Sequence, residues 1–252
     1  MKKLLLILLC LPMIGFGQQT YVPDDNFEAY LEANSMGNGI ANDDSVNTAN
    51  INTVTTVSVV STNISDLTGI EDFTALTGLY CYDNQLTSLD VSNNTNLTEM
   101  WCDNNQLTNL DVSQNTALTN LQCGNNQLTS LDVSQNTALT VLACDTNQLT
   151  SLDVRNGNNT NMYLNAYTNP NLYCIDVDNV AWSTSNWLVS SFEIDSQHYF
   201  STNCSTTNIN EDTTNKKLLK VTDLLGRETK QTNQPLFYIY DDGTVEKRIV
   251  IE

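Results

Sequence analysis

The side chains that could do chemistry recur at a fixed interval along the middle of the chain. Four cysteines are spaced 21 residues apart, at Cys81, Cys102, Cys123 and Cys144. Zinc is held by thiolates when four of them surround one ion, and equivalent positions in successive repeats do not form such a tetrahedron. We therefore interpret these cysteines as free thiols that serve as small apolar side chains in a core.

A second series consists of carboxylates. Four aspartates follow the same interval, at Asp90, Asp111, Asp132 and Asp153. Carboxylates about 5 Å apart in water repel one another by about 0.8 kcal/mol, which solvent and the adjacent serine hydroxyls can absorb. We expect no cofactor, with calcium on this row of aspartates as the alternative. Residues 38–47 also have carboxylates spaced as in calcium loops, but without the full loop pattern.

The residues needed for catalysis are scarce. The chain has one histidine, His198, and no GxSxG, HExxH or glycine-rich phosphate motif. Paired carboxylates can hydrolyse a glycoside, but the aspartates recur with the repeat, which indicates a structural task. We therefore predict that the protein is not an enzyme, with a glycan-active enzyme as the alternative.

These side chains belong to four copies of one 21-residue repeat, which begin at Leu76, Leu97, Leu118 and Leu139. The copies follow the pattern LxxLxCxxNxLxxLxVxxN, and a fixed period of this length is typical of a solenoid. Each copy has two similar halves, so we expect two short strands per coil and parallel ladders with strands about 4.8 Å apart. Leu, Cys and Val should point inward. A row of amides should satisfy buried backbone groups, at Asn84, Asn105, Asn126 and Asn147.

This pattern resembles the leucine-rich repeat, and its two similar halves resemble the nested bacterial class called IRREKO. The divergent coil at residues 51–73 resembles the internalin type of leucine-rich repeat. The resemblance implies a mostly β leucine-rich-repeat solenoid of about six coils over residues 54–178.

Both ends of the solenoid are expected to be capped. Residues 1–17 have the composition of a signal peptide, and residues 18–53 should form an N-terminal cap whose helix places Phe27, Tyr30 and Leu31 on one face. Residues 179–205 are rich in aromatics that should cover the other end, and the stretch TNPNLYCIDVDNVAWSTSNW at residues 168–187 resembles the C-terminal cap of secreted Bacteroidetes-type leucine-rich-repeat proteins. Cys174 and Cys204 flank this cap in an oxidising compartment, so we predict a disulfide between them.

The last part of the chain differs in composition from the repeats. A polar linker is expected at residues 206–215, followed by a tail at 216–252 with candidate strands at 218–223, 236–240 and 245–251. The sequences DLLGRE and LFYIYDDGTVEKRIVIE resemble the C-terminal sorting domain of type IX secretion. The resemblance implies export by that machinery to the surface or surroundings of a Gram-negative bacterium.

The charge and the varying positions of the repeat indicate the kind of partner. A net charge of −19 disfavours nucleic acid and anionic membranes, and we expect no membrane span. The outward positions of the second half repeat the same residues, whereas those of the first half differ in every coil. We therefore predict a non-catalytic protein that binds an extracellular protein or glycan, with a structural surface or matrix component as the alternative. The expected binding face consists of Tyr80, Tyr82, Glu99, Trp101, Asp103 and Gln122.

Overall fold

The computed structural model describes residues 17–191, 193–204, 218–222, 235–240 and 245–249. The chain divides into two compact units, Met1–Cys204 and Ser205–Glu252. The predicted signal peptide, apart from Gly17, and the predicted linker at 206–215 lie outside the described residues. In the described part of the chain, no helix is both long and apolar enough to cross a bilayer.

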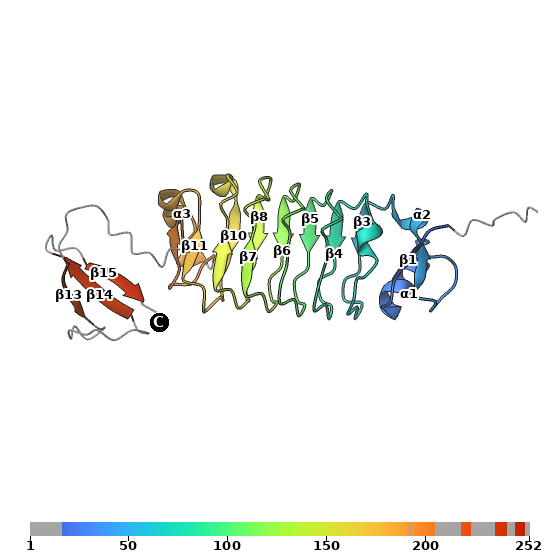
Figure 1. Cartoon of the computed structure of the whole chain (residues 1–252), viewed down its shortest axis with the longest axis horizontal. Helices are drawn as coiled ribbons and strands as arrows, with labels where there is room; N and C mark the ends of the chain where they lie inside the picture. The colour runs from blue at the N-terminus through green and yellow to red at the C-terminus, as the bar shows by residue number, and fades with distance from the viewer. Residues whose placement is uncertain (1–16, 192, 205–217, 223–234, 241–244, 250–252) are drawn as a thin grey trace, which may run out of the picture. The chain divides into compact units, whose positions relative to one another are not determined.

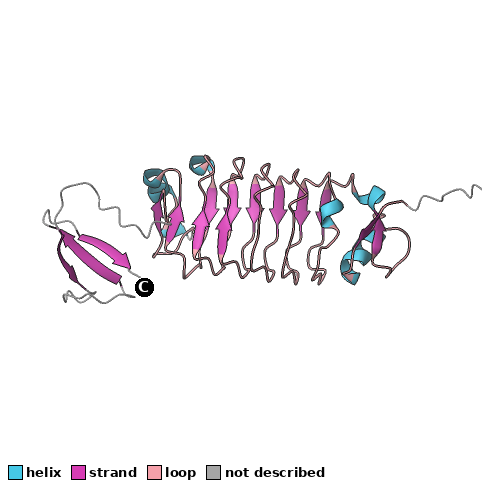
Figure 2. Ribbon diagram, in the orientation of Figure 1, coloured by secondary structure: helices cyan, strands magenta, loops and turns pink. Residues whose placement is uncertain are grey.

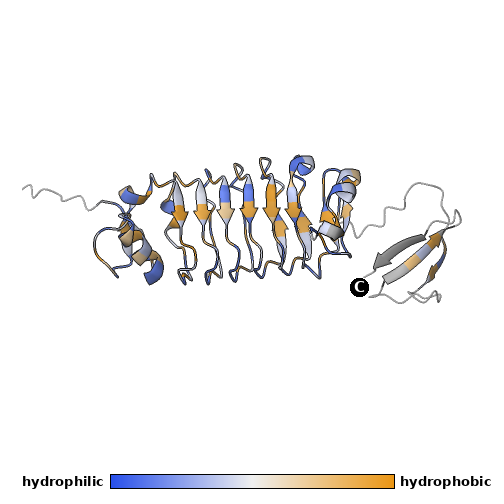
Figure 3. Ribbon diagram, turned by 180° about the vertical axis from the view of Figure 1, so that it is seen from behind, coloured by the Kyte–Doolittle hydropathy of each residue, from blue (hydrophilic) through white to orange (hydrophobic). Residues whose placement is uncertain are grey.

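The first unit is a leucine-rich-repeat solenoid, as predicted (Figure 1). The first halves of its coils form a six-stranded parallel sheet. Along the solenoid, the strands of this main sheet are β3 (Thr56–Ser58), β4 (Gly78–Tyr80), β5 (Glu99–Trp101), β6 (Asn120–Gln122), β8 (Val141–Ala143) and β10 (Tyr163–Asn165). The middle residue of each strand is buried and its two neighbours face outward, because side chains alternate along a strand. Apolar segments therefore recur from coil to coil (Figure 3).

The second halves form a shorter ladder than expected. A four-stranded parallel sheet joins β7 (Ser130–Asp132), β9 (Ser151–Asp153), β11 (Cys174–Asp176) and β12 (Tyr199–Ser201). The prediction of two strands in every coil is wrong for the coils that begin at Leu76 and Leu97, where residues 88–90 and 109–111 are irregular. In the preceding coil the equivalent residues, 66–68, are also irregular and are followed by the 3-10 helix η1 (Ile70–Asp72), so residues 88–90 have no strand to pair with there.

Two rows of asparagines hold the corners between the sheets. The side-chain N–H of Asn105 donates to the carbonyls of Cys81 and Cys102 at 3.0 and 3.1 Å, and its oxygen accepts the N–H of Leu86 at 2.9 Å. Asn84, Asn126 and Asn147 repeat this arrangement. A second, fully buried row connects the other corner, at Asn94, Asn115 and Asn136. The predicted ladder is therefore confirmed, because buried backbone groups require such partners.

The N-terminal end is closed by a small α/β cap. Strand β1 (Gln19–Tyr21) pairs antiparallel with β2 (Ser45–Asn47), and the helices are α1 (Asp25–Ala33) and α2 (Thr48–Ile51). The predicted helix is confirmed: Phe27 and Leu31 are fully buried and Tyr30 packs at the margin of the core. Phe27 stacks on Phe73 with ring centroids 6.3 Å apart, so the cap continues the solenoid core.

The C-terminal end is closed by η2 (Asn159–Asn161), α3 (Val180–Asn186), η3 (Val189–Ser191) and β12. The described helical segments thus lie near the two ends of the repeats (Figure 2). Trp187 is the centre of this cap, with ring centroids 5.7 Å from Trp182 and 5.6 Å from Phe200. Tyr199, which we expected to cover the core, is 58% exposed because β12 turns it outward. The predicted Cys174–Cys204 disulfide is confirmed.

The second unit contains an antiparallel sheet. Its order is β13 (Leu218–Thr222), β14 (Pro235–Tyr240) and β15 (Val245–Ile249). These three strands agree with the small β tail expected from the sequence.

Candidate functional site

The residues expected to form a binding face come together on the outward surface of the main sheet. Tyr80 on β4 is in register with Trp101 on β5, and Trp101 with Gln122 on β6. Glu99 occupies the other outward position of β5. Tyr82 and Asp103 follow their strands by two residues, so they continue the same face at its edge.

The aromatic side chains of this face pack against one another. Tyr80 and Trp101 make an edge-to-face contact with centroids 5.1 Å apart, and Tyr82 lies 6.2 Å from Trp101. These rings are half-buried, whereas we expected them to be exposed, because pairing of adjacent coils places them side by side. The Tyr80 hydroxyl donates to Glu99 at 2.7 Å, and this bond raises the pKa of Tyr80. The indole N–H of Trp101 has no partner among the residues that the structure describes.

At the edge of the face that carries Asp103, a glycine makes room for the neighbouring carboxylates. Asp103 accepts the N–H of Gly124 at 3.2 Å, and burial is the main reason that the pKa of Asp103 is raised. A Cβ atom at position 124 would lie 2.9 Å from a carboxylate oxygen of Asp145. The absence of a side chain on Gly124 therefore leaves space for an acidic side chain of the next coil.

The repeated aspartates on the other side have a local structural role. Their carboxylates accept the N–H two residues further on: Asp90 from Ser92 at 2.9 Å, Asp111 from Ser113 at 2.9 Å and Asp132 from Ser134 at 2.8 Å. The fourth, Asp153, accepts from Arg155 at 3.0 Å and forms an ion pair with it. These turns explain why the residues repeat without invoking a metal. Calcium on this row stays a prediction.

An open groove of about 600 Å³ lies where the second ladder is missing. Its lining includes Asp66 and Glu71 from the divergent coil and Asp90 and Asp111 from the next two. The lining segments at residues 66–68, 88–90 and 109–111 form no strand, so this groove lies over the irregular first coils. Sequence reasoning did not predict it.

The four cysteines of the repeats are buried, unreactive thiols. Cys81, Cys102, Cys123 and Cys144 are free and fully buried. Burial raises the pKa of Cys81 to about 12 and raises the pKa of the other three as well. Because the thiolate is both the nucleophile and the metal ligand, these thiols do neither task in the folded protein.

His198 belongs to the C-terminal cap. Its Nδ1 accepts the backbone N–H of Asp195 at 3.3 Å, and burial lowers its pKa. The Asp195 carboxylate in turn accepts the N–H groups of Thr168 and Asn169 at 3.0 and 2.8 Å. This arrangement fixes the last corner of the solenoid, which agrees with a structural role for the histidine.

One exposed aromatic of the main sheet was not predicted. Tyr163 on β10 is 52% exposed and continues the outward row of Glu99, Asn120 and Val141. The repeat pattern decays before this coil, but aligning Leu164 with Leu142 would have placed Tyr163 on the face. It lies at the far end of the sheet from the aromatic cluster.

Comparison with known proteins identifies relatives of the repeat region. No protein-family model matches the chain. Internalin J of Listeria monocytogenes serotype 4b (strain F2365) is 37% identical over 75 residues, which are 30% of this chain and 8% of internalin J. The solved functional domain of internalin J from Listeria monocytogenes, which includes a cysteine ladder, has a TM-score of 0.54 and 39% identity over 64% of this chain and 38% of that one. A solved internalin, InlF, from strain 4b F2365 has a TM-score of 0.45 and 19% identity over 71% and 56% of the two chains.

The chain thus spans well under half of internalin J and of its solved domain. Within that part it has an internalin-like leucine-rich-repeat fold. In this chain, four buried free cysteines recur in successive coils.

Proposed function

We propose that this protein is a secreted or cell-surface binding protein that recognises an extracellular protein or glycan through the outward face of its main sheet, without catalysis. The observation that carries this proposal is the difference between the two sides of the coil. Asp90 and its equivalents are retained because each closes a turn, and the asparagines because each satisfies buried backbone groups. The outward positions of the main sheet have no comparable task and differ from coil to coil.

The chemistry of the face suits recognition. Tyr and Trp dominate the energetics of many interfaces because they bury large areas with few rotatable bonds. Glu99, which accepts the Tyr80 hydroxyl, and Asp103, which accepts the N–H of Gly124, add carboxylate acceptors to the same face. Such a mixture of ring faces and acceptors matches a sugar or a polar protein surface.

The similarity to internalin J supports a binding role. The match to its solved functional domain covers 64% of this chain at 39% identity. The partner remains a proposal, because the chain spans only 38% of that domain.

We further propose export by the type IX machinery of a Gram-negative bacterium of the Bacteroidetes type, directed by residues 1–17 and 216–252, and assign the repeats to the IRREKO class. A sheet in a compact unit of its own is consistent with a tail that acts as a separate sorting signal. Deleting residues 216–252 should strand the protein in the periplasm. Normal export of the shortened chain would contradict the assignment.

The binding face is tested by removing its two central rings. Tyr80→Ser with Trp101→Ser should weaken binding by about 30-fold or more for each ring removed, since each hot-spot residue contributes about 2 kcal/mol. The partner is sought on a glycan array and by capture from extracellular protein, and affinity is then measured for each variant.

The matched control is Tyr173→Ser with Tyr199→Ser, which removes two rings that are 46% and 58% exposed outside the face. This control should bind normally, and the melting temperature of both variants is measured alongside. Equal binding by the face variant and wild type would show that the face is wrongly placed. No saturable partner in either screen would favour a structural matrix component.

A further inference from the structure

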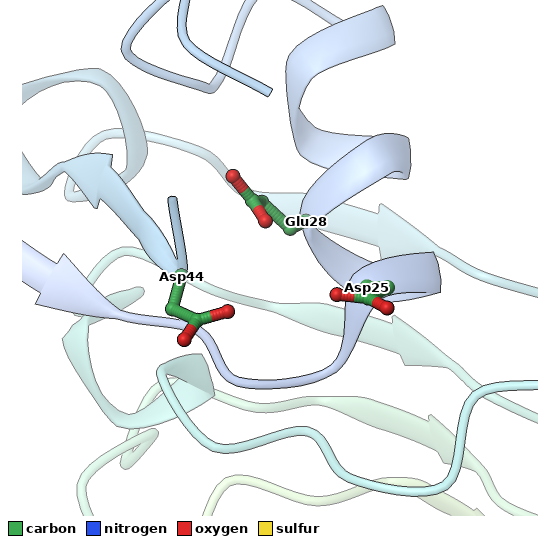
Figure 4. A group of neighbouring side chains, drawn as sticks. All are labelled: Asp25, Glu28 and Asp44. Carbon is green, nitrogen blue, oxygen red and sulfur yellow. The ribbon is translucent and has the colours of Figure 1, made fainter. Parts of the chain in front are cut away.

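Three carboxylates meet in the N-terminal cap, away from the proposed binding face. Asp25 and Glu28 lie one turn apart on α1, and Asp44 directly precedes β2. One oxygen from each of the three lies within 4.8 Å of the others. Figure 4 shows the helix and the neighbouring segment that supply them, with Asp25 and Asp44 turned toward each other.

Glu28 is the unusual member of this group. Its side chain is 0% exposed, although glutamate is a surface residue in most proteins. One carboxylate oxygen accepts the N–H of Asp43 at 3.1 Å. The other, Oε2, is buried and has no hydrogen-bond partner in the described part of the chain. Burying a carboxylate oxygen without a partner is unfavourable, so this atom requires a cation or a proton.

The other acidic side chains of the cap already have partners. Asp24 accepts the N–H of Asn26 and Phe27 as the N-cap of α1. Glu32 accepts N–H groups from the loop, including that of Asn38 at 2.7 Å. Asp43, which also contacts Glu28, is held by Asn38 and Ser45, and the bond from Asn38 is the main reason that its pKa is lowered.

By contrast, the carboxylates of Asp25 and Asp44 make no hydrogen bond within the described residues. No basic side chain of the cap neutralises the group either, because Arg155 is the only lysine or arginine between residues 18 and 204. Arg155 is engaged by Asp153 and, at 3.7 Å, by Asp176. Within residues 18–204, therefore, no basic side chain compensates the negative charge of the three carboxylates.

The ligand set indicates which ion would bind. All three ligands are oxygens, which Ca²⁺ prefers, whereas zinc sites are built mainly from nitrogen and sulfur. Two oxygens on opposite sides of Ca²⁺ are up to about 5 Å apart, since each bond is about 2.3–2.6 Å long. The spacing observed here fits that range. Mg²⁺ demands a tighter octahedron and is a poorer match.

We propose that Asp25, Glu28 and Asp44 bind one calcium ion, which joins the first turn of α1 to the segment before β2. The position of Asp44 is fixed by its backbone, because its carbonyl accepts the N–H of Val22 at 2.9 Å and its φ is 55°. The ion thereby fastens the helix whose Phe27 and Leu31 close the N-terminal end of the core. Calcium binding stabilises the cap against opening, since the site is incomplete in the unfolded chain.

The test uses the full chain, freed of metal by chelation, and calcium chloride as the probe. Isothermal titration calorimetry should show one saturable site with a dissociation constant of about 10⁻⁴–10⁻³ M, the range of extracellular calcium modules. The melting temperature should rise with calcium and fall back when a chelator is added. Magnesium chloride at the same concentration should have a smaller effect.

Paired variants locate the site. Asp25→Asn with Asp44→Asn removes two exposed charges and should weaken calcium binding at least tenfold without unfolding the protein. Asp90→Asn with Asp111→Asn removes the same charge from the repeated aspartates, keeps an oxygen for each turn, and should leave binding unchanged.

Three results would overturn the proposal. The first is the absence of both saturable binding and a rise in melting temperature up to about 10 mM calcium, well above the expected dissociation constant. In that case a proton on Glu28, and not calcium, would neutralise its buried carboxylate. The second is unchanged binding by the Asp25 and Asp44 variant. The third is loss of binding in the Asp90 and Asp111 variant alone, which would place calcium on the repeated aspartates instead.

Discussion

The asparagine ladder makes a quantitative prediction for stability. Asn126 accepts the N–H of Leu107 at 3.0 Å and donates to the carbonyls of Cys102 and Cys123 at 3.0 and 3.2 Å. Replacing Asn126 by Ala leaves the buried N–H of Leu107 without its partner, whereas the carbonyl of Cys102 keeps a bond from Asn105 at 3.1 Å.

The magnitude follows from these contacts. A buried donor left without a partner costs about 1–3 kcal/mol, and each further hydrogen bond lost contributes about 0.5–1.5 kcal/mol. We therefore expect Asn126→Ala to lower the free energy of unfolding by about 3 kcal/mol. The neighbouring exposed residue provides the control: Gln127→Ala should change stability by less than about 0.5 kcal/mol.

The assay is equilibrium unfolding in urea, followed by circular dichroism and by tryptophan fluorescence. Agreement between the two probes checks that the solenoid unfolds in one step, because repeat proteins can lose cooperativity. If Asn126→Ala and Gln127→Ala differ by less than about 1 kcal/mol at equal m-values, the ladder does not stabilise the coil in the way described.

Three further predictions concern the ends and the core. Replacing Cys174 and Cys204 by Ser should lower the free energy of unfolding by about 3.5 kcal/mol in the chain-entropy model, because the disulfide spans 30 residues. Urea titration measures this loss, and an unchanged unfolding midpoint would contradict the prediction. The four core thiols should resist iodoacetamide at about pH 8 until urea unfolds the chain, since burial raises the pKa of Cys81 to about 12; mass spectrometry of the native protein would reveal any early alkylation. Burial raises the pKa of Asp24, but hydrogen bonds from Ser65, Phe27 and Asp66 lower it by more, so the net pKa is lowered. The stabilisation that Asp24 contributes is therefore present above pH 3.8 and is lost as the pH falls through the pKa of the folded state. Asp24→Ala should therefore destabilise the protein more at about pH 7 than at about pH 2, and an equal effect at both would refute this.

The repeat made most of the first unit predictable. Its period specifies which side chains are buried, and the buried row from Leu79 to Leu142 and the corner amides follow directly from it. The missing strands at 88–90 and 109–111 were not predictable, because these segments have the same LD pattern as β7. What differs is the neighbouring coil: residues 66–68 form no strand with which 88–90 could pair, and 88–90 in turn form none with which 109–111 could pair.

The site was predicted in part. The position of each outward residue follows from strand alternation, and Tyr80, Trp101 and Gln122 lie together as expected. The half-burial of the two rings was not predicted, because it arises from packing between coils. The carboxylate group around Glu28 was also predicted only in part. Asp44 lies in residues 38–47, whose carboxylate spacing suggested calcium, but Asp25 and Glu28 are 19 and 16 residues before it, and only the folded cap brings them together.

The most direct test of the proposed binding face is site-specific photo-cross-linking to the captured partner. A benzophenone amino acid replaces either Gln122, on β6 of the main sheet, or Gln114, an exposed glutamine in the second half of the preceding coil. Irradiation of the complex should yield a covalent adduct from position 122 and none from position 114. An adduct from position 114 alone would place the partner on the other side of the solenoid and contradict the account.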